Sequence, residues 1–170
     1  VTTAAATTVR LAASLAADDA VVAVDQMVAT GTVDLADVRA LAAAGRGRGA
    51  ARARRACARA DGLAESPQET RVRLLLHGSR LPQPVAQYRI VADGEFVARV
   101  DFAWPDLRIA LEYDGLWHAE SGQFARDRRR LNRLQAAGWR VVFVTAADLH
   151  RPERLLAALA QALGWPWSAL

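Results

Sequence analysis

The sequence contains no lysine, so all 22 of its basic residues are arginines. A mechanism that needs a lysine ammonium as base or nucleophile is therefore excluded, because a guanidinium does not give up its proton in a protein. The formal net charge of +4 favours a polyanionic partner such as DNA. The same alanine-rich, lysine-free composition is also what a coding bias of the source would produce.

Cysteine and long apolar runs are also scarce. The single cysteine, Cys57, excludes an internal disulfide and fits a reducing compartment. No apolar run reaches the roughly 20 residues of a membrane-spanning helix, and the first residues do not resemble a signal peptide. We therefore expect a cytoplasmic protein. Because the chain begins with Val1 rather than methionine, a preceding DNA-binding domain, a protein partner and the oligomeric state all stay open.

Aromatic residues are absent from residues 1–87, and all eleven lie between Tyr88 and Trp167. This change in composition predicts a helical segment over residues 1–61 and an α/β domain over residues 62–170. Alanine-rich periodicity and capping residues such as Asp34 predict four helices in the first segment. Their expected ranges are 8–16, 18–28, 34–44 and 49–60.

The fourth of these helices belongs to a basic stretch, residues 46–59, that holds six arginines and no acid. Arg52, Arg55 and Arg59 recur at helical spacing on one side. This pattern indicates either a helix that contacts phosphates or a solvated face that pairs with acids elsewhere in the chain. The sequence leaves both interpretations open, with Arg52 and Arg55 as candidate nucleic-acid contacts.

The second part of the chain changes from helical periodicity to alternation at Val85. Before it, Ser66 and Glu69 form a capping box for a helix that ends at Gly78. The alternation predicts a meander of three strands, with Pro105-Asp106 as a two-residue connection between the second and third. A helix, a continuously apolar and therefore buried strand, and a last helix follow. Their expected ranges are 87–91, 95–104 and 107–114 for the meander, then 122–137, 139–144 and 152–163.

Three acids lie within the predicted second and third strands. A two-residue connection pairs Trp104 with Leu107 and therefore places Asp101 opposite Ala110. Alternation then brings Asp101, Glu112 and Asp114 to one face of the sheet. Solvent, arginine partners or a divalent cation would each relieve the repulsion among these carboxylates, and all three remain open here.

The segment VDFAWPDLRIALEYDGLWH, residues 100–118, resembles the PD-(D/E)XK nuclease superfamily. It is most similar to the very-short-patch-repair endonuclease-like branch, which includes uncharacterised bacterial proteins and the C-terminal domains of abortive-infection antitoxin-like proteins. The resemblance covers about residues 65 to 163. It implies an α/β, restriction-endonuclease-like core behind the helical segment, and hydrolysis of DNA phosphodiester bonds with Mg²⁺ or Mn²⁺ as cofactor.

The resemblance also implies roles for individual residues. Asp101 and Glu112 would be metal ligands, Glu69 the assisting acid on the preceding helix, and His118 a general base or water-orienting group. Asp114 stands where the superfamily usually has lysine. Since the chain has no lysine, either His118 or an arginine takes that role, or activity is lost. The alternative function is therefore an inactive nuclease-like module that binds DNA or a partner protein, as an antitoxin or transcriptional regulator would.

The helix predicted over residues 122–137 supplies the remaining candidates. Asp127 falls on its expected buried stripe, between Phe124 and Leu131, and would need a partner such as Arg130. In the resembling proteins an Asp-x-x-Arg pair on this helix borders the site. An exposed basic face would contact phosphates, and Trp117 would anchor the loop in the core or support the site. The candidate contacts on this helix are Arg126, Arg129, Arg130 and Arg133.

Overall fold

The computed structural model describes residues 2–115 and 123–166, and the chain divides into two compact units, residues 1–74 and residues 75–170. We call them the helical unit and the sheet unit, and each is described by itself. The division falls inside α5 (Pro67–His77) and not at residue 61, because the first turns of α5 bind the helices that precede it.

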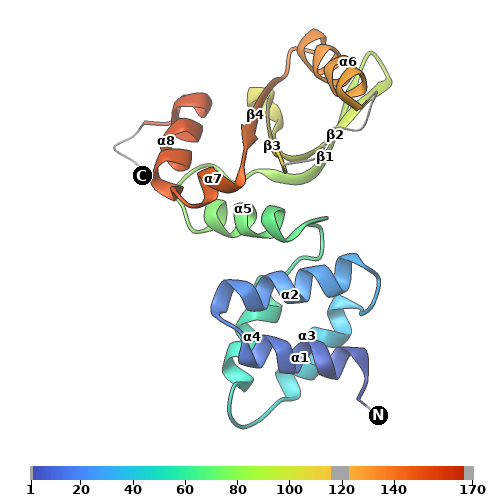
Figure 1. Cartoon of the computed structure of the whole chain (residues 1–170), viewed down its shortest axis with the longest axis vertical. Helices are drawn as coiled ribbons and strands as arrows, with labels where there is room; N and C mark the ends of the chain where they lie inside the picture. The colour runs from blue at the N-terminus through green and yellow to red at the C-terminus, as the bar shows by residue number, and fades with distance from the viewer. Residues whose placement is uncertain (1, 116–122, 167–170) are drawn as a thin grey trace. The chain divides into compact units, whose positions relative to one another are not determined.

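The helical unit contains four complete helices and the start of α5 (Figure 1). The four helices predicted in this segment are confirmed, with small shifts of their ends. The first helix begins earlier than expected because the Thr3 hydroxyl accepts a hydrogen bond from the amide of Ala6. Asp34 caps the third helix as predicted. The bounds are α1 (Ala4–Ser14), α2 (Ala17–Ala29), α3 (Leu35–Ala44) and α4 (Ala50–Arg59).

The core of the helical unit is built from small side chains around one buried charge. Val21, Val24 and Val38 are fully buried, together with several alanines. Asp25, also fully buried, lies on α2 and accepts hydrogen bonds from the amides of Asp61 and Gly62, both at 2.9 Å. Its second oxygen accepts from the Thr70 hydroxyl at 2.9 Å and from the Arg73 guanidinium at 2.7 Å. These bonds hold α5 and the segment before it to α2.

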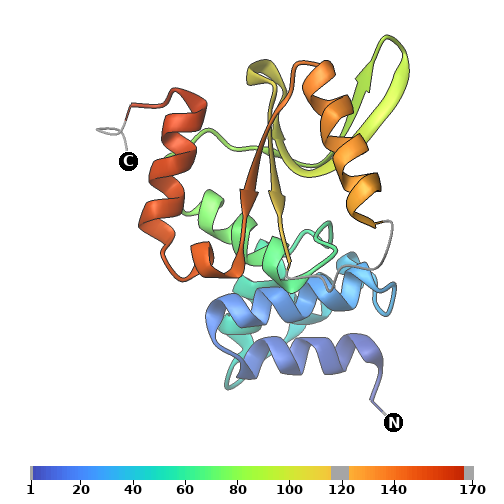
Figure 2. The same ribbon diagram turned by 45° about the horizontal axis from the view of Figure 1, so that its top comes forward.

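The sheet unit contains a four-stranded mixed sheet in the order β1-β2-β3-β4. The first three strands are antiparallel neighbours, and β4 runs parallel to β3. Helix α6 lies on one side of the sheet and α8 on the other, as both ribbon views show (Figures 1 and 2). The predicted α/β class and order of elements are confirmed. The bounds are β1 (Val85–Ala92), β2 (Glu95–Trp104), η1 (Pro105–Leu107), β3 (Ile109–Tyr113), α6 (Gln123–Ala136), β4 (Arg140–Val144), α7 (Ala146–Leu149) and α8 (Pro152–Leu163).

The predicted two-residue connection between the second and third strands is wrong. The chain instead makes the 3-10 turn η1 and passes through Arg108 in the left-handed region, with φ of 50°. The observed register pairs Phe102 with Leu111, Ala103 with Ala110 and Trp104 with Ile109. It differs from the predicted register by two residues, which leaves every side chain on its predicted face because the side-chain period of a strand is also two.

The prediction that the apolar strand β4 is buried is also wrong. It lies at one edge of the sheet, where Phe143 is 45% exposed. Only Val144 of this strand is buried. A continuous apolar run is typical of a parallel strand covered on both faces, but such a pattern does not show whether the strand has one neighbour or two.

The core between α6 and the sheet joins aliphatic side chains of the helix and strands with Tyr88 and Trp139. Leu134 of α6 is fully buried and packs in one cluster with Val100, Ala110 and Trp139. The rings of Tyr88 and Trp139 are 5.7 Å apart. Within residues 2–115 and 123–166, no helix has both the length and the apolar character that crossing a bilayer requires.

Candidate functional site

The acids Asp101 and Glu112 lie on adjacent strands, on the sheet face that α6 covers. The β2–β3 pairs end at Phe102 and Leu111, so Asp101 and Glu112 each lie next to the last pair on their strands. One oxygen of Asp101 accepts a hydrogen bond of 2.8 Å from the backbone amide of Tyr113. The Glu112 side chain is only 13% exposed. A carboxylate this deeply covered needs a partner, and α6 supplies one.

Arg130 of α6 binds Glu112 in a bidentate manner. Its Nη1 donates to Oε2 at 2.7 Å, and its Nη2 donates to Oε1 at 2.6 Å. Nη2 also donates to the backbone carbonyl of Arg99 at 2.8 Å. The hydrogen bonds to Glu112 raise the pKa of the Arg130 guanidinium above its ordinary value, and the charges of Glu112, Asp101 and Asp127 add to this effect against the opposing effect of burial.

The pairing of Arg130 with Glu112 determines whether Asp101 and Glu112 are arranged to bind a metal ion. Both oxygens of Glu112 face Arg130, and one oxygen of Asp101 faces a backbone amide. Mg²⁺ requires carboxylate oxygens turned toward it, so Glu112 does not fit as a metal ligand in this arrangement. Among the described residues, no group of three or more histidine, cysteine, aspartate or glutamate side chains is placed to hold a metal. Of the three ways to relieve the repulsion of the acids, the structure shows an arginine partner at Glu112.

Of the other predicted catalytic residues, the structure describes Asp114 and Glu69. Asp114 lies beyond the end of β3 with its side chain exposed, and its amide donates to Val144 O at 2.7 Å. His118 and Trp117 fall outside the described residues. Glu69 belongs to the helical unit, where its carboxylate accepts from the amide of Glu65 at 2.8 Å.

Glu69 is 8% exposed and contributes to the start of α5 as its capping-box position predicts. Its amide donates to the Ser66 hydroxyl at 3.2 Å, while its carboxylate satisfies an amide of the preceding turn. The reciprocal bond reaches Glu65 rather than Ser66, one residue further back than in the standard motif. The side chain therefore has a structural role at the beginning of this helix.

Helix α6 displays the other predicted arginines to solvent. Arg126, Arg129 and Arg133 are exposed, and no hydrogen bond or ion pair of their side chains is found in the described part of the chain. Their spacing of three and four residues places them along one stripe of the helix, which we call the α6 stripe. Asp127 is exposed too, so its predicted place on the buried stripe is wrong. All side chains from residue 125 to 129 are exposed, and burial on this helix begins further along.

The arginines of the helical unit are used differently. Nη1 of Arg52 lies 3.3 to 3.4 Å from the carbonyl oxygens of Ala13, Ser14 and Leu15, where α1 ends. These carbonyls lack partners within the helix, so the guanidinium serves as a C-terminal cap. Arg59 pairs with Asp18 at 2.9 Å. Of the two candidate contacts, only Arg55 is exposed without a side-chain partner in the described residues.

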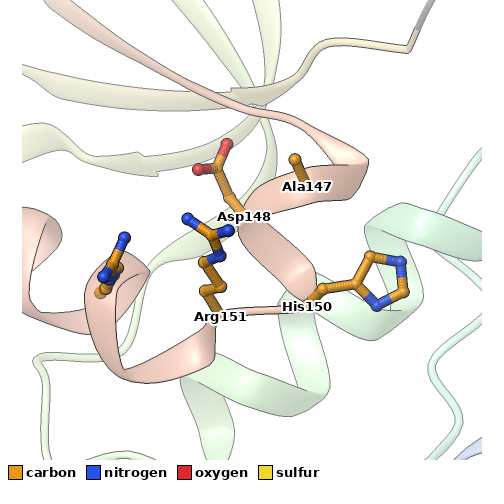
Figure 3. A pocket seen from close by; sticks show the side chains of 5 residues that line it. Ala147, Asp148, His150 and Arg151 are labelled. Carbon is orange, nitrogen blue, oxygen red and sulfur yellow. The ribbon is translucent and has the colours of Figure 1, made fainter.

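The sequence patterns did not predict a cavity beside α7 and α8. A cavity of about 420 Å³ is lined by Ala147, Asp148, His150, Arg151 and Arg154 (Figure 3). The Arg151 side chain extends toward Asp148, whereas His150 points away from both. Asp148 is committed to the cap of α7, accepting from the Thr145 hydroxyl at 2.7 Å and the Thr145 amide at 2.8 Å.

These hydrogen bonds from Thr145, and then the charge of Arg151, hold the pKa of Asp148 below its ordinary value despite some desolvation. The Asp148 carboxylate is therefore ionised near neutral pH. Its negative charge partly cancels the positive charges that line the cavity. The side chains around it do not converge on one point, and the structure gives it no clearer role than the capping of α7.

Comparison with known proteins finds relatives to which no activity is assigned. The chain is 43% identical over 118 residues to uncharacterised proteins from two strains of Mycobacterium tuberculosis, CDC 1551 and H37Rv. The match covers 68% of this chain but 44% of each relative, so the chain spans less than half the length of the curated relatives it matches. No family model matches the sequence, and no solved structure matches it significantly.

Proposed function

We propose that the sheet unit binds DNA through the α6 stripe, as a nuclease-like module that does not hydrolyse it. The observation that carries this proposal is the bidentate pair of Arg130 and Glu112, which occupies both oxygens of the second predicted metal ligand. The pair also fixes α6 to the sheet, so that the adjacent stripe is presented on a rigid element. Rigid cations at helical spacing suit contacts with successive backbone phosphates.

A second candidate function is metal-dependent hydrolysis of DNA. It is favoured by the placement of Asp101 and Glu112 on adjacent strands next to the last β2–β3 pair, together with the resemblance of this segment to the very-short-patch-repair endonuclease-like branch. Asp101 and Glu112 would hold Mg²⁺ or Mn²⁺ only after Arg130 has left Glu112. The metal would then lower the pKa of a bound water and stabilise charge on the phosphate.

The binding proposal is tested by the salt dependence of affinity for a short DNA duplex. Replacing Arg126, Arg129 or Arg133 by glutamine is expected to reduce the slope of log K against log salt concentration by about one for each arginine. Arg55→Gln is the matched control, since it also removes an exposed, unpartnered arginine but from the helical unit. Equal losses in Arg55→Gln and the α6 variants would contradict a binding surface on α6.

Cleavage assays separate the two candidates. The proposal expects no cleavage of DNA by the full chain with Mg²⁺ or Mn²⁺. Cleavage that is abolished by EDTA and by Asp101→Asn would instead establish the hydrolytic function. In that case Arg130→Gln, which frees both oxygens of Glu112, would tighten Mg²⁺ binding, as measured by calorimetry. Intact DNA in every assay, together with the salt slopes above, supports the binding module.

A further inference from the structure

Strand β4 is the last strand of the sheet, and its outer side has no neighbouring strand among the described residues. The amide of Arg140 donates to Arg108 O at 2.9 Å, and Val144 O accepts an amide hydrogen bond of 2.7 Å from the residue after β3. In a parallel pair, alternate residues turn both backbone groups toward the same neighbour. Every second residue from Arg140 to Val144 therefore faces β3, and the amides and carbonyls of Val141 and Phe143 point outward. Within the described residues, no hydrogen bond to these outward groups is found.

This edge lacks the features that usually keep an exposed strand from pairing with another chain. Such features are an inward-pointing charge, a proline, a bulge or a covering loop. The sequence of β4 is RVVFV, so its only charged side chain is that of Arg140, which donates to the carbonyl of Ala162 in α8. Phe143 adds an aromatic ring that is 45% exposed. The edge is therefore regular, apolar and free of unpaired charge.

The opposite edge of the same sheet, β1, is irregular. Gln87 adopts a φ of 49°, and the pairing of β1 with β2 shifts between Ile90 and Val91. Arg89 places an exposed charge in the middle of the strand. An irregular and charged strand pairs poorly with a further strand. Of the two edges, β4 is therefore the one suited to pairing.

The edge of β4 is complementary to a second copy of itself. In an antiparallel arrangement about a twofold axis at Val142, Val141 of each copy lies opposite Phe143 of the other. Both residues of this pair have outward backbone groups, so each pair can exchange two hydrogen bonds. Val141 packs against the core cluster under α6, and alternation places Phe143 on the same face. Each exposed phenylalanine ring would then cover a valine of the other copy.

The charges of β4 also permit two copies to meet. The twofold register places Arg140 opposite Val144 of the other copy, so no like charges oppose each other. The same register satisfies all the outward backbone groups of both strands at once. A pairing that closes by twofold symmetry leaves no free edge for a third copy. These properties favour a second copy of this chain over a strand of a different protein.

We infer that β4 is a homodimerisation strand, which joins the four-stranded sheets of two copies into one continuous sheet. The inference does not rest on DNA binding by the α6 stripe or on the acid pair, since it uses no residue of either. Five residues from each copy are fewer than the roughly 20–30 of a standard interface, so the association should be weak. We expect a dissociation constant of about 10–100 μM.

Sedimentation equilibrium of the full chain, over concentrations from about 1 μM to 500 μM, tests the dimer. We expect a reversible monomer–dimer equilibrium that Phe143→Lys weakens about tenfold or more, because an ammonium replaces the ring that covers the other copy. Phe96→Lys is the matched control, since Phe96 is 48% exposed but belongs to β2, inside the sheet. A chain that stays monomeric throughout would overturn the inference and leave this edge to a strand of another protein. Equal dimerisation of Phe143→Lys and the unaltered chain would overturn it as well.

Cysteine substitution tests the register. In an antiparallel sheet, directly opposed residues that exchange no hydrogen bonds have Cα atoms about 4.5 Å apart, within the range for a disulfide. Val142→Cys should therefore form a covalent dimer on mild oxidation, seen by non-reducing electrophoresis. Val141→Cys should not, because its neighbour across the axis is Phe143, and the native Cys57 is buried. Equal cross-linking of the two variants, or none in Val142→Cys, with the fold intact by circular dichroism, would overturn the twofold pairing.

Discussion

Arginine has different partners in the two units of this protein. In the helical unit, Arg46, Arg52 and Arg54 donate to carbonyl oxygens where α3 or α1 ends. In the sheet unit, the α6 stripe shows three arginines to solvent, and a fourth on the same helix binds Glu112. The comparison teaches that a cluster of arginines indicates a nucleic-acid surface only when nearby backbone carbonyls and acids are already satisfied.

The cores of the two units differ as strongly as their arginines. The helical unit is packed with alanine and valine and keeps its buried polar centre at Asp25. The sheet unit packs aromatic and large aliphatic side chains between α6 and the strands. Because all aromatic residues belong to residues 88–167, tryptophan fluorescence reports on the sheet unit, while most of the helical signal comes from elsewhere.

The largest expected effect is on the helical unit and comes from Asp25→Ala. The variant leaves two amides without their acceptor and takes from the buried Arg73 guanidinium one of its two acidic partners, the other being Asp61. It should therefore lower the free energy of unfolding by about 3–5 kcal/mol. Chemical denaturation followed by far-ultraviolet circular dichroism measures this loss. Asp18→Ala is the control, because its pair with Arg59 is exposed and worth less than about 1 kcal/mol. Similar losses in the two variants would refute the special role of Asp25.

A smaller effect tests the use of arginines as caps. Arg52→Gln shortens the reach to the carbonyls at the end of α1 and should cost about 0.5–1 kcal/mol of stability. Its affinity for DNA and the salt slope of that affinity should stay unchanged. Arg55→Gln, three residues along the same helix, should leave stability unaltered. A loss of DNA affinity in Arg52→Gln would remove the contrast between the two units.

The smallest effect concerns pH and the sheet unit. The pKa of Asp148 is held low by Thr145, so its contribution to stability is present above the ordinary aspartate pKa of about 3.9. That contribution disappears as the pH falls through the lower pKa of the folded state. Thr145→Val removes the hydroxyl donor and should therefore destabilise the protein near neutral pH but hardly at all in strong acid. An equal loss at both extremes, measured by thermal unfolding, would contradict this assignment.

Local sequence signals predicted most of the elements. Asp34 and Ser66 mark the starts of their helices, and residues 152–163 form the last helix at its predicted bounds. The connection after Trp104 was wrong because a two-residue turn and a 3-10 turn both accept Pro-Asp, so this dipeptide does not distinguish them. The edge position of β4 was missed because hydrophobicity does not reveal the number of neighbouring strands.

The sequence likewise predicted some features of the candidate site and missed others. Alternation placed Asp101 and Glu112 on one face even though the register was wrong by two, because side-chain direction depends only on whether that error is odd or even. The sequence alone therefore determined the order of elements, the shared face of the acids and the absence of lysine. Tertiary structure decided that Arg130 binds Glu112 and that Arg52 caps α1, because each contact joins residues far apart in the sequence that only folding brings together. The free edge of β4 likewise exists only once the strands have paired in the order β1-β2-β3-β4.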